Sequence, residues 1–170
     1  MKAYLNNESG FTMIELILVI AILGVLSSIA ALSGKDMYDN YKTRGAARQL
    51  YSDMQYARLS AIKGGRPWVV DFMDDKSYRV MIKDSTVYKT INIPLQFKGV
   101  KICNYTDSLS PLKDAQFNPN GTAGGTAADF GVKVSLGGKV YKIYIPSIGT
   151  GIVRVINLSS KEPLNAIPCP

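Results

Sequence analysis

Residues 11–32 have the sequence FTMIELILVIAILGVLSSIAAL, in which Glu15 is the only charged residue. At about 1.5 Å per residue, an α-helix of this length can cross the hydrocarbon core of a bilayer. The preceding segment, residues 1–10, has the polar sequence MKAYLNNESG. The sequence therefore predicts one long apolar helix near the N-terminus, preceded by a short polar segment.

Three interpretations of this N-terminal segment compete. The first is a secretory signal, because residues 16–26 fit its apolar region and Ser28-Ile29-Ala30 fits its small-x-small cleavage site. The second is a plain membrane anchor. The third is a leader that is cut after Gly10, so that the apolar helix stays in the mature protein.

The charge of Glu15 favours the third interpretation. A carboxylate deep in a spanning helix costs roughly 2.5–3.5 kcal/mol on insertion scales, and neither a signal nor a plain anchor gains from it. Cleavage after Gly10 would give Phe11 a free amine, which can pair with Glu15 of a neighbouring subunit. Glu15 would then set the register of helices in an assembly. The alternative is a chance acid near the membrane interface.

Residues 10–16, GFTMIEL, resemble the G-F-T-x-x-E-[LM] signal of type IV pilins and type II secretion pseudopilins. The resemblance implies cleavage after Gly10 by a prepilin peptidase and N-methylation of Phe11. It also implies that Glu15 recruits or aligns subunits during assembly.

The helical pattern continues beyond the apolar segment, because apolar residues recur at mostly helical spacing from Tyr41 to Ala61. Gly64 and Gly65 are expected to end this helix near Lys63. Charged residues are expected on its other faces, namely Lys42, Arg44, Arg48 and Asp53. The predicted organisation is a cleaved leader (1–10), a transmembrane and assembly half of the helix (11–33), an amphipathic half (34–64), and a β-rich head with an irregular C-terminal tail (65–170).

Period-two alternation after residue 65 predicts a head of short strands. The predicted strands are residues 68–73, 78–83, 87–93, 100–103, 130–136, 139–145 and 152–156. Residues 107–112 and 121–128 are predicted loops, and residues 118–121, NPNG, a turn.

Further segments of the chain resemble the GspH/FimT/FimU group of minor pilins and minor pseudopilins. They are residues 57–63 with 66–69, the turn at 117–121, and the closing strand at 149–155. The resemblance implies an α+β fold in which the long helix, transmembrane in its first half, packs against two antiparallel sheets.

The composition argues against an enzyme. The chain has no histidine, which excludes a Ser/His/Asp set and removes the commonest transition-metal ligand. Asp71, Asp74 and Asp75 are close in sequence, but a solvated turn explains them better than a metal site. Two cysteines, Cys103 and Cys169, are too few for a zinc motif. They could form a disulfide or remain as two unpaired thiols. No catalytic residue, metal or cofactor is expected.

A net charge of +7 predicts a mildly basic surface, with weak affinity for DNA or anionic lipid as the alternative. Some competence pilins on the FimT side of the group bind DNA, and the arginines of a G-R-x-R motif are implicated. Here Gly151 and Arg154 match that motif, and Ile152 replaces its first arginine. Lys139, Lys142 and Arg154 would share a face if the last strands pair.

The expected function is that of a minor pilin or pseudopilin, incorporated in or at the tip of a type IV pilus or type II secretion pseudopilus. It would prime assembly through packing of its N-terminal helix. Expected partners are prepilin peptidase, other minor subunits, the major pilin and the inner-membrane assembly platform. Before assembly it would lie in the bacterial inner membrane with its head outside the cytoplasm. The alternatives are a DNA-binding competence pilin and a secreted or anchored enzyme.

Overall fold

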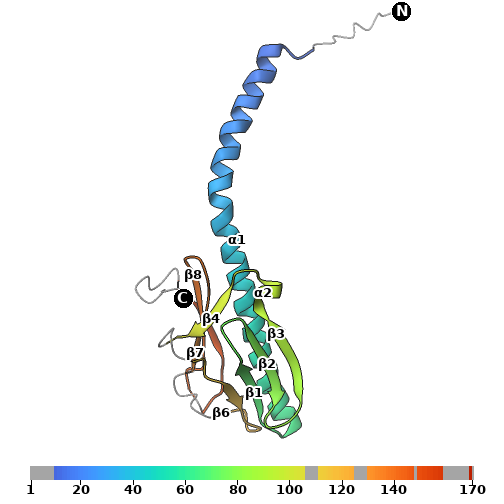
Figure 1. Ribbon diagram of the computed structural model, residues 1–170, viewed down its shortest axis with the longest axis vertical. Coiled ribbons are helices and arrows are strands. Elements are labelled where there is room, and N and C mark those ends of the chain that lie inside the picture. Colours follow the sequence, from blue (N-terminus) through green and yellow to red (C-terminus); the bar gives the residue numbers. More distant parts are fainter. Residues whose placement is uncertain (1–9, 106–110, 125–129, 148, 159–168, 170) are drawn as a thin grey trace, which may run out of the picture. The chain divides into compact units, whose positions relative to one another are not determined.

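The structure, a computed structural model, describes residues 10–105, 111–124, 130–147, 149–158 and 169, without the side chains of residues 30–33. The chain divides into two compact units, Met1–Met37 and Tyr38–Pro170. The long helix α1 (Met13–Gly64) begins in the first unit and ends in the second. Figure 1 shows that the strands of the second unit lie beside the C-terminal half of α1.

The C-terminal half of α1 packs against the head through small and apolar side chains. The buried helix residues are Ala46, Ala47, Leu50, Met54, Ala57 and Ala61. The alanines add little bulk, so the sheets can approach the helix backbone closely. The helix ends at Gly64, and Gly65 has a φ of +61°, a left-handed conformation that favours glycine. The predicted end of the helix is confirmed.

The first sheet of the head is antiparallel and has the order β3-β2-β1-β5-β6. Its strands are β1 (Trp68–Phe72), β2 (Ser77–Ile82), β3 (Val87–Asn92), β5 (Ala115–Phe117) and β6 (Ala123–Gly124). Val70 of the central strand lies opposite Val80 on one side and Ala115 on the other. All three are buried, so this face of the sheet forms part of the core.

The second sheet is antiparallel and has the order β4-β7-β8-β9. Its strands are β4 (Lys101–Asn104), β7 (Gly131–Leu136), β8 (Lys139–Tyr144) and β9 (Arg154–Asn157). A hairpin joins β7 to β8 through Gly137, whose φ of +58° is the left-handed conformation that tight hairpin turns require. The prediction of two antiparallel sheets is confirmed, and β9 forms one edge of the second sheet.

Three details differ from the sequence prediction. The predicted loop 121–128 contains β6, and β5 was not predicted, because strands of two or three residues are too short to show alternation. The predicted strand 87–93 stops at Asn92, since Ile93 begins the short helix α2 (Ile93–Gln96), with a proline in its first turn. Residues 107–110 of the other predicted loop, and all of the predicted tail after residue 158 except Cys169, lie outside the described residues.

Asp53 is buried with the head, although it was predicted on a face of the helix other than the apolar one. The residue is only 7% exposed. Its carboxylate accepts hydrogen bonds from Tyr78 Oη at 2.7 Å, Lys89 Nζ at 3.0 Å and Gln49 Nε2 at 3.1 Å. These three donors compensate the lost hydration, so the acid joins α1 to β2 and β3. Helical periodicity alone does not reveal such partners on other strands.

The Tyr78 hydroxyl should make the head sensitive to alkaline pH. Burial, together with the charge and hydrogen bond of Asp53, raises the pKa of Tyr78 well above its ordinary value of 10. Above pH 10 the unfolded chain therefore loses this proton while the folded chain retains it. The free energy of unfolding should fall by up to about 1.4 kcal/mol per pH unit from this residue alone.

Denaturant unfolding would measure this dependence from about pH 9 to about pH 12, that is, from about one pH unit below the ordinary tyrosine pKa to about two above it. Tyr78→Phe should have a shallower loss of stability with rising pH than the unmodified chain. Tyr41→Phe, at an exposed position of α1, serves as the matched control and should keep the full slope. Equal slopes for Tyr78→Phe and the unmodified chain would contradict the assignment.

A corner at the end of the head joins three segments that resemble the GspH/FimT/FimU group. Arg58 of α1 donates from Nε to the carbonyl of Gly121 at 3.1 Å and from Nη2 to the carbonyl of Thr150 at 3.0 Å. The predicted turn is confirmed, since the Gly121 N–H donates to the Asn118 carbonyl at 2.9 Å. Gly151 has a φ of +57°, and a Cβ atom there would collide with the backbone carbonyl oxygen of Gly121. This corner fixes where β9 begins.

Gly151→Ala is expected to lower the free energy of unfolding by about 1–3 kcal/mol, because alanine disfavours a positive φ and its Cβ meets rigid backbone. Gly149→Ala is the matched control, since the nearest atom to its Cβ would be Ser147 Oγ at 3.9 Å. Thermal or denaturant unfolding of both variants measures the difference. Equal stability of the two would show that the corner tolerates a side chain.

Candidate functional site

The first candidate site is the start of α1, in the first unit of the chain. Phe11 is 83% exposed and precedes the helix together with Gly10. Thr12 caps the helix, because its Oγ1 accepts the N–H of Glu15 at 3.3 Å and its carbonyl accepts the N–H of Leu16 at 3.2 Å. The predicted leader lies outside the described residues except for Gly10.

Glu15 lies in the first turn of α1, where the helix dipole favours a negative charge. Its side chain is exposed, and it has no ion-pair partner among the residues that the structure describes. The carboxylate is therefore accessible to a cation from another chain. Processing at Gly10 and Phe11 and the role of Glu15 in assembly remain predictions.

The helix that follows is apolar on every side. Leu, Ile, Val and Met side chains from Met13 to Ile29 are between 48% and 84% exposed. Among the described helices, none alone is both long and apolar enough to span a membrane, whereas Met13–Ile29 and Gly34–Gly64, joined across a bend, meet the length and composition requirements together.

Cys103 and Cys169 form a disulfide, with their Cα atoms 5.7 Å apart. This resolves the two alternatives that the sequence left open. The bond joins β4 to the end of the chain across a sequence separation of 66 residues. The Cys169 N–H also donates to Ser135 Oγ of β7 at 2.9 Å. Cys169 is thus anchored to the second sheet.

The second sheet is basic throughout. Its four strands contain five basic residues and no acidic residue: Lys101, Lys133, Lys139, Lys142 and Arg154. Lys142 Nζ lies 3.3 Å from the ring centroid of Tyr105 and 4.7 Å from that of Tyr144. Positive charge and aromatic rings therefore alternate on one face of this sheet.

The structure brings two of the three predicted DNA contacts to that face. Arg154 lies directly opposite Tyr144 in the β8–β9 register, and Tyr144 is two residues from Lys142, so Lys142 and Arg154 share a face. Lys139 is an odd number of residues from Lys142 and therefore lies on the opposite face, next to the hairpin turn. The expectation that all three share one face is wrong for Lys139.

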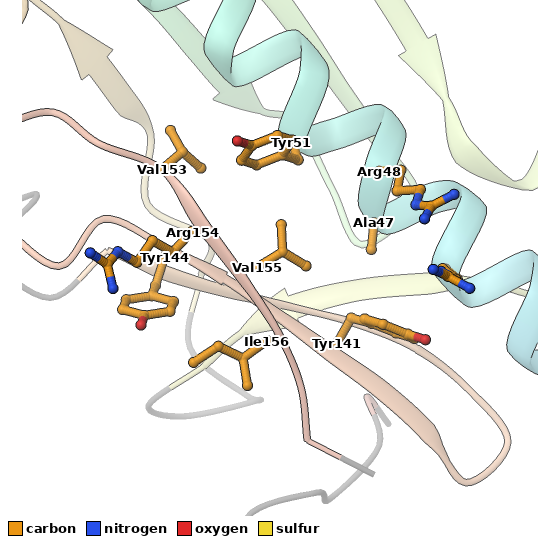
Figure 2. A pocket seen from close by; sticks show the side chains of 10 residues that line it. Ala47, Arg48, Tyr51, Tyr141, Tyr144, Val153, Arg154, Val155 and Ile156 are labelled. Carbon is orange, nitrogen blue, oxygen red and sulfur yellow. The ribbon is translucent and has the colours of Figure 1, made fainter. Parts of the chain in front are cut away.

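A groove separates α1 from the edge of the second sheet and has a volume of about 590 Å³. Its helix side is lined by Arg44, Ala47, Arg48 and Tyr51, and its sheet side by Tyr141, Tyr144, Val153, Arg154, Val155 and Ile156. Figure 2 shows Val155 pointing toward α1, whereas Arg154 points away from the helix and lies beside Tyr144. The sequence predicted only that Arg44 and Arg48 lie on the non-apolar faces of the helix. The groove was not predicted, although the i, i+4 spacing of the two arginines places them on one helix face.

The acidic residues of the first sheet have local structural roles. Asp74 accepts hydrogen bonds from the Lys76 N–H and from Ser77 Oγ, both at 2.8 Å. Asp71 forms an ion pair with Arg79. Across the described residues there is no group of three His, Cys, Asp or Glu side chains that could hold a metal ion.

Two family models match the sequence. Residues 5–31 match the prokaryotic N-terminal methylation motif. Residues 46–149 match type II transport protein GspH. The first match covers the start of α1, and the second covers the buried half of α1 and most of both sheets.

Curated relatives and a solved structure are also similar. Competence protein ComGD of Bacillus subtilis is 30% identical over 158 residues, which is 91% of this chain and 98% of that protein. Type II secretion system protein H of Escherichia coli is 26% identical over 93 residues, 54% of each chain. The type IV minor pilin FimU of Pseudomonas aeruginosa has the same fold, with a TM-score of 0.54 at 17% identity, over 75% of this chain and 96% of FimU.

Proposed function

The chain belongs to the type II transport protein GspH family, and on that premise we propose that it joins a filament at or near its tip and primes its assembly. Members of this family are structural pilins and pseudopilins, not enzymes. Few copies would be needed for such a role. After removal of the leader, the apolar half of α1 would leave the membrane and pack among the helices of neighbouring subunits.

One observation supports this proposal above the others. The methylation motif includes the first part of α1, which is exposed and apolar on every side, and Glu15 in its first turn has an accessible carboxylate. A bundle of identical or related helices would cover that apolar surface. The free amine of a processed Phe11 would supply the cation that Glu15 lacks among the residues that the structure describes.

We place this subunit in a competence-type filament, among type IV pilus and type II secretion machines. The support is the length of the match to ComGD, a competence protein, of which 98% is covered. The match to the secretion protein covers only 54% of that protein. Before assembly the subunit would lie in the inner membrane with its head outside the cytoplasm, and its partners would be the peptidase, the major pilin and other minor subunits.

Fractionation of filaments sheared from cells tests this function. The full-length chain with a C-terminal tag should be found in the sheared fraction at a small fraction of the amount of the major pilin, and deletion of its gene should reduce the number of filaments. The same chain in cells without prepilin peptidase should stay in the membrane fraction. A normal number of filaments after deletion, with the tagged chain absent from them, would contradict the proposal.

DNA binding is a second candidate function, and the basic second sheet is the observation that favours it. Lys142 and Arg154 share one face of this sheet, and with the tyrosines beside Lys142 they provide contacts for phosphates and for stacked bases. The detergent-solubilised mature chain should then retard duplex or single-stranded DNA at low salt. Arg154→Ala should weaken binding. Arg66→Ala should not, because Arg66 is an exposed basic residue that precedes β1 of the first sheet. Failure to retard DNA at low salt would exclude this function.

A further inference from the structure

The edge of the second sheet is open beside the groove. β9 pairs with β8 on one side and has no strand on the other in the described sheet. The Leu158 N–H donates to the Val140 carbonyl, so the pairs 142–156 and 144–154 carry the hydrogen bonds between the two strands. The N–H and C=O of Val155 therefore point away from β8, along the open edge.

The side chains in the groove suit an alternation of apolar and acidic residues. Val153 and Val155 lie on the sheet side, and Ala47 and Tyr51 lie on the helix side. These side chains form an apolar floor. The volume of the groove, about 590 Å³, is within the range of typical ligand pockets. Figure 2 shows Val153 and Val155 on the side of the strand that faces α1, so an apolar side chain beside β9 could pack between them and the helix.

The charges at the margins of the groove are all positive. Arg44 and Arg48 line it from the helix, Arg154 lines it from the strand, and no Asp or Glu among the described residues lines it. The same two helix arginines also line a second hollow of about 450 Å³, on the Phe97 side of α1, where again none of the described lining residues is acidic. The surface is therefore complementary to carboxylates on both sides of α1.

We propose that this groove binds an extended acidic segment of a neighbouring filament subunit, which adds to β9 as a further strand. The inference rests on the proposed function, because it names what the head of a filament subunit contacts. Backbone hydrogen bonds to Val155 would hold the segment. Its apolar side chains would pack on the floor on the α1 side, and its carboxylates, on the opposite face, would reach Arg154. A nucleic acid would satisfy the arginines but would leave the edge backbone groups and the apolar floor without matching partners.

Fluorescence anisotropy with the detergent-solubilised mature chain tests the site directly. The probe is a short labelled peptide in which valine and glutamate alternate. It should bind with a micromolar Kd that weakens as salt is added. Two control peptides should bind at least about tenfold more weakly. One has lysine in place of glutamate, and the other has N-methyl groups on alternate amides, which prevent addition to a strand edge.

Variants of the groove provide the second arm of the test. Arg154→Ala should raise the Kd of the acidic peptide about fivefold to tenfold, the loss expected for one charge-assisted hydrogen bond. Arg66→Ala removes the same charge from an exposed position outside the groove and should leave the Kd unchanged. Unchanged circular dichroism would show that both variants are folded.

Several results would overturn the inference. Equal binding of the acidic, lysine and N-methylated peptides would show that no strand-addition site exists. Tighter binding of single-stranded DNA than of the acidic peptide, with the same loss in Arg154→Ala, would assign the groove to a nucleic acid instead. The proposed filament function is tested separately, by the presence of the tagged chain in sheared filaments. A negative result for the groove would therefore leave that function intact.

Discussion

Glu15→Ala should remove the subunit from filaments while leaving its folding, membrane insertion and cleavage unchanged. The carboxylate is exposed in the first turn of α1, at the end where a processed chain has its new amine. In an apolar bundle, loss of one partner leaves the other charge buried and unpaired, at a cost of about 3–5 kcal/mol. This cost would reduce incorporation by more than about a hundredfold.

Quantitative immunoblotting of sheared filaments and membranes measures this effect. Glu15→Gln keeps the size of the side chain but removes its charge, and it should be as defective as Glu15→Ala. Glu15→Asp keeps the charge on a shorter side chain and should recover part of the incorporation. Wild-type amounts of Glu15→Ala in the sheared fraction would show that Glu15 is a chance acid at the membrane interface.

The disulfide should contribute a large share of the stability of the head. Cys103 and Cys169 close a loop with a sequence separation of 66 residues. Loss of such a crosslink increases the entropy of the unfolded chain and should lower the free energy of unfolding by roughly 2–4 kcal/mol. The chain with Cys103→Ser and Cys169→Ser together measures this without leaving a free thiol.

Denaturant unfolding of the double variant should match that of the unmodified chain in the presence of a reductant. The unmodified chain without reductant should unfold at a clearly higher denaturant concentration than either. The same midpoint in all three samples would mean that the crosslink does not stabilise the head. Disulfides persist in oxidising compartments outside the cytoplasm, so this bond is consistent with the predicted export of the head.

Features set by local sequence were predicted well. The end of α1 follows from Gly64 and Gly65, and the β7–β8 hairpin follows from Gly137 and Gly138, because a residue without Cβ accepts a positive φ. The apolar segment and the motif at residues 10–16 were sufficient to identify the N-terminal methylation motif that the family model confirms. In each case the physical cause lies within a few adjacent residues.

Features set by long-range packing were not predicted. Asp53 is buried because Tyr78 and Lys89, on two other strands, supply its hydrogen bonds. The groove exists because β9 ends the second sheet beside α1. The opposite orientation of Lys139 and Lys142, in contrast, follows from their spacing of three residues in one strand and could have been predicted. A single sequence carries no direct signal of which strands become neighbours.

N-terminal mass spectrometry of the mature protein, from cells with and without prepilin peptidase, tests the central claim most directly. Processing as a pilin predicts an N-terminus at N-methylated Phe11 in the first cells and an uncut chain in the second. An N-terminus at Ala31 in both would instead identify an ordinary signal peptide. The apolar helix and Glu15 would then be absent from the mature protein, and assembly through them would be excluded.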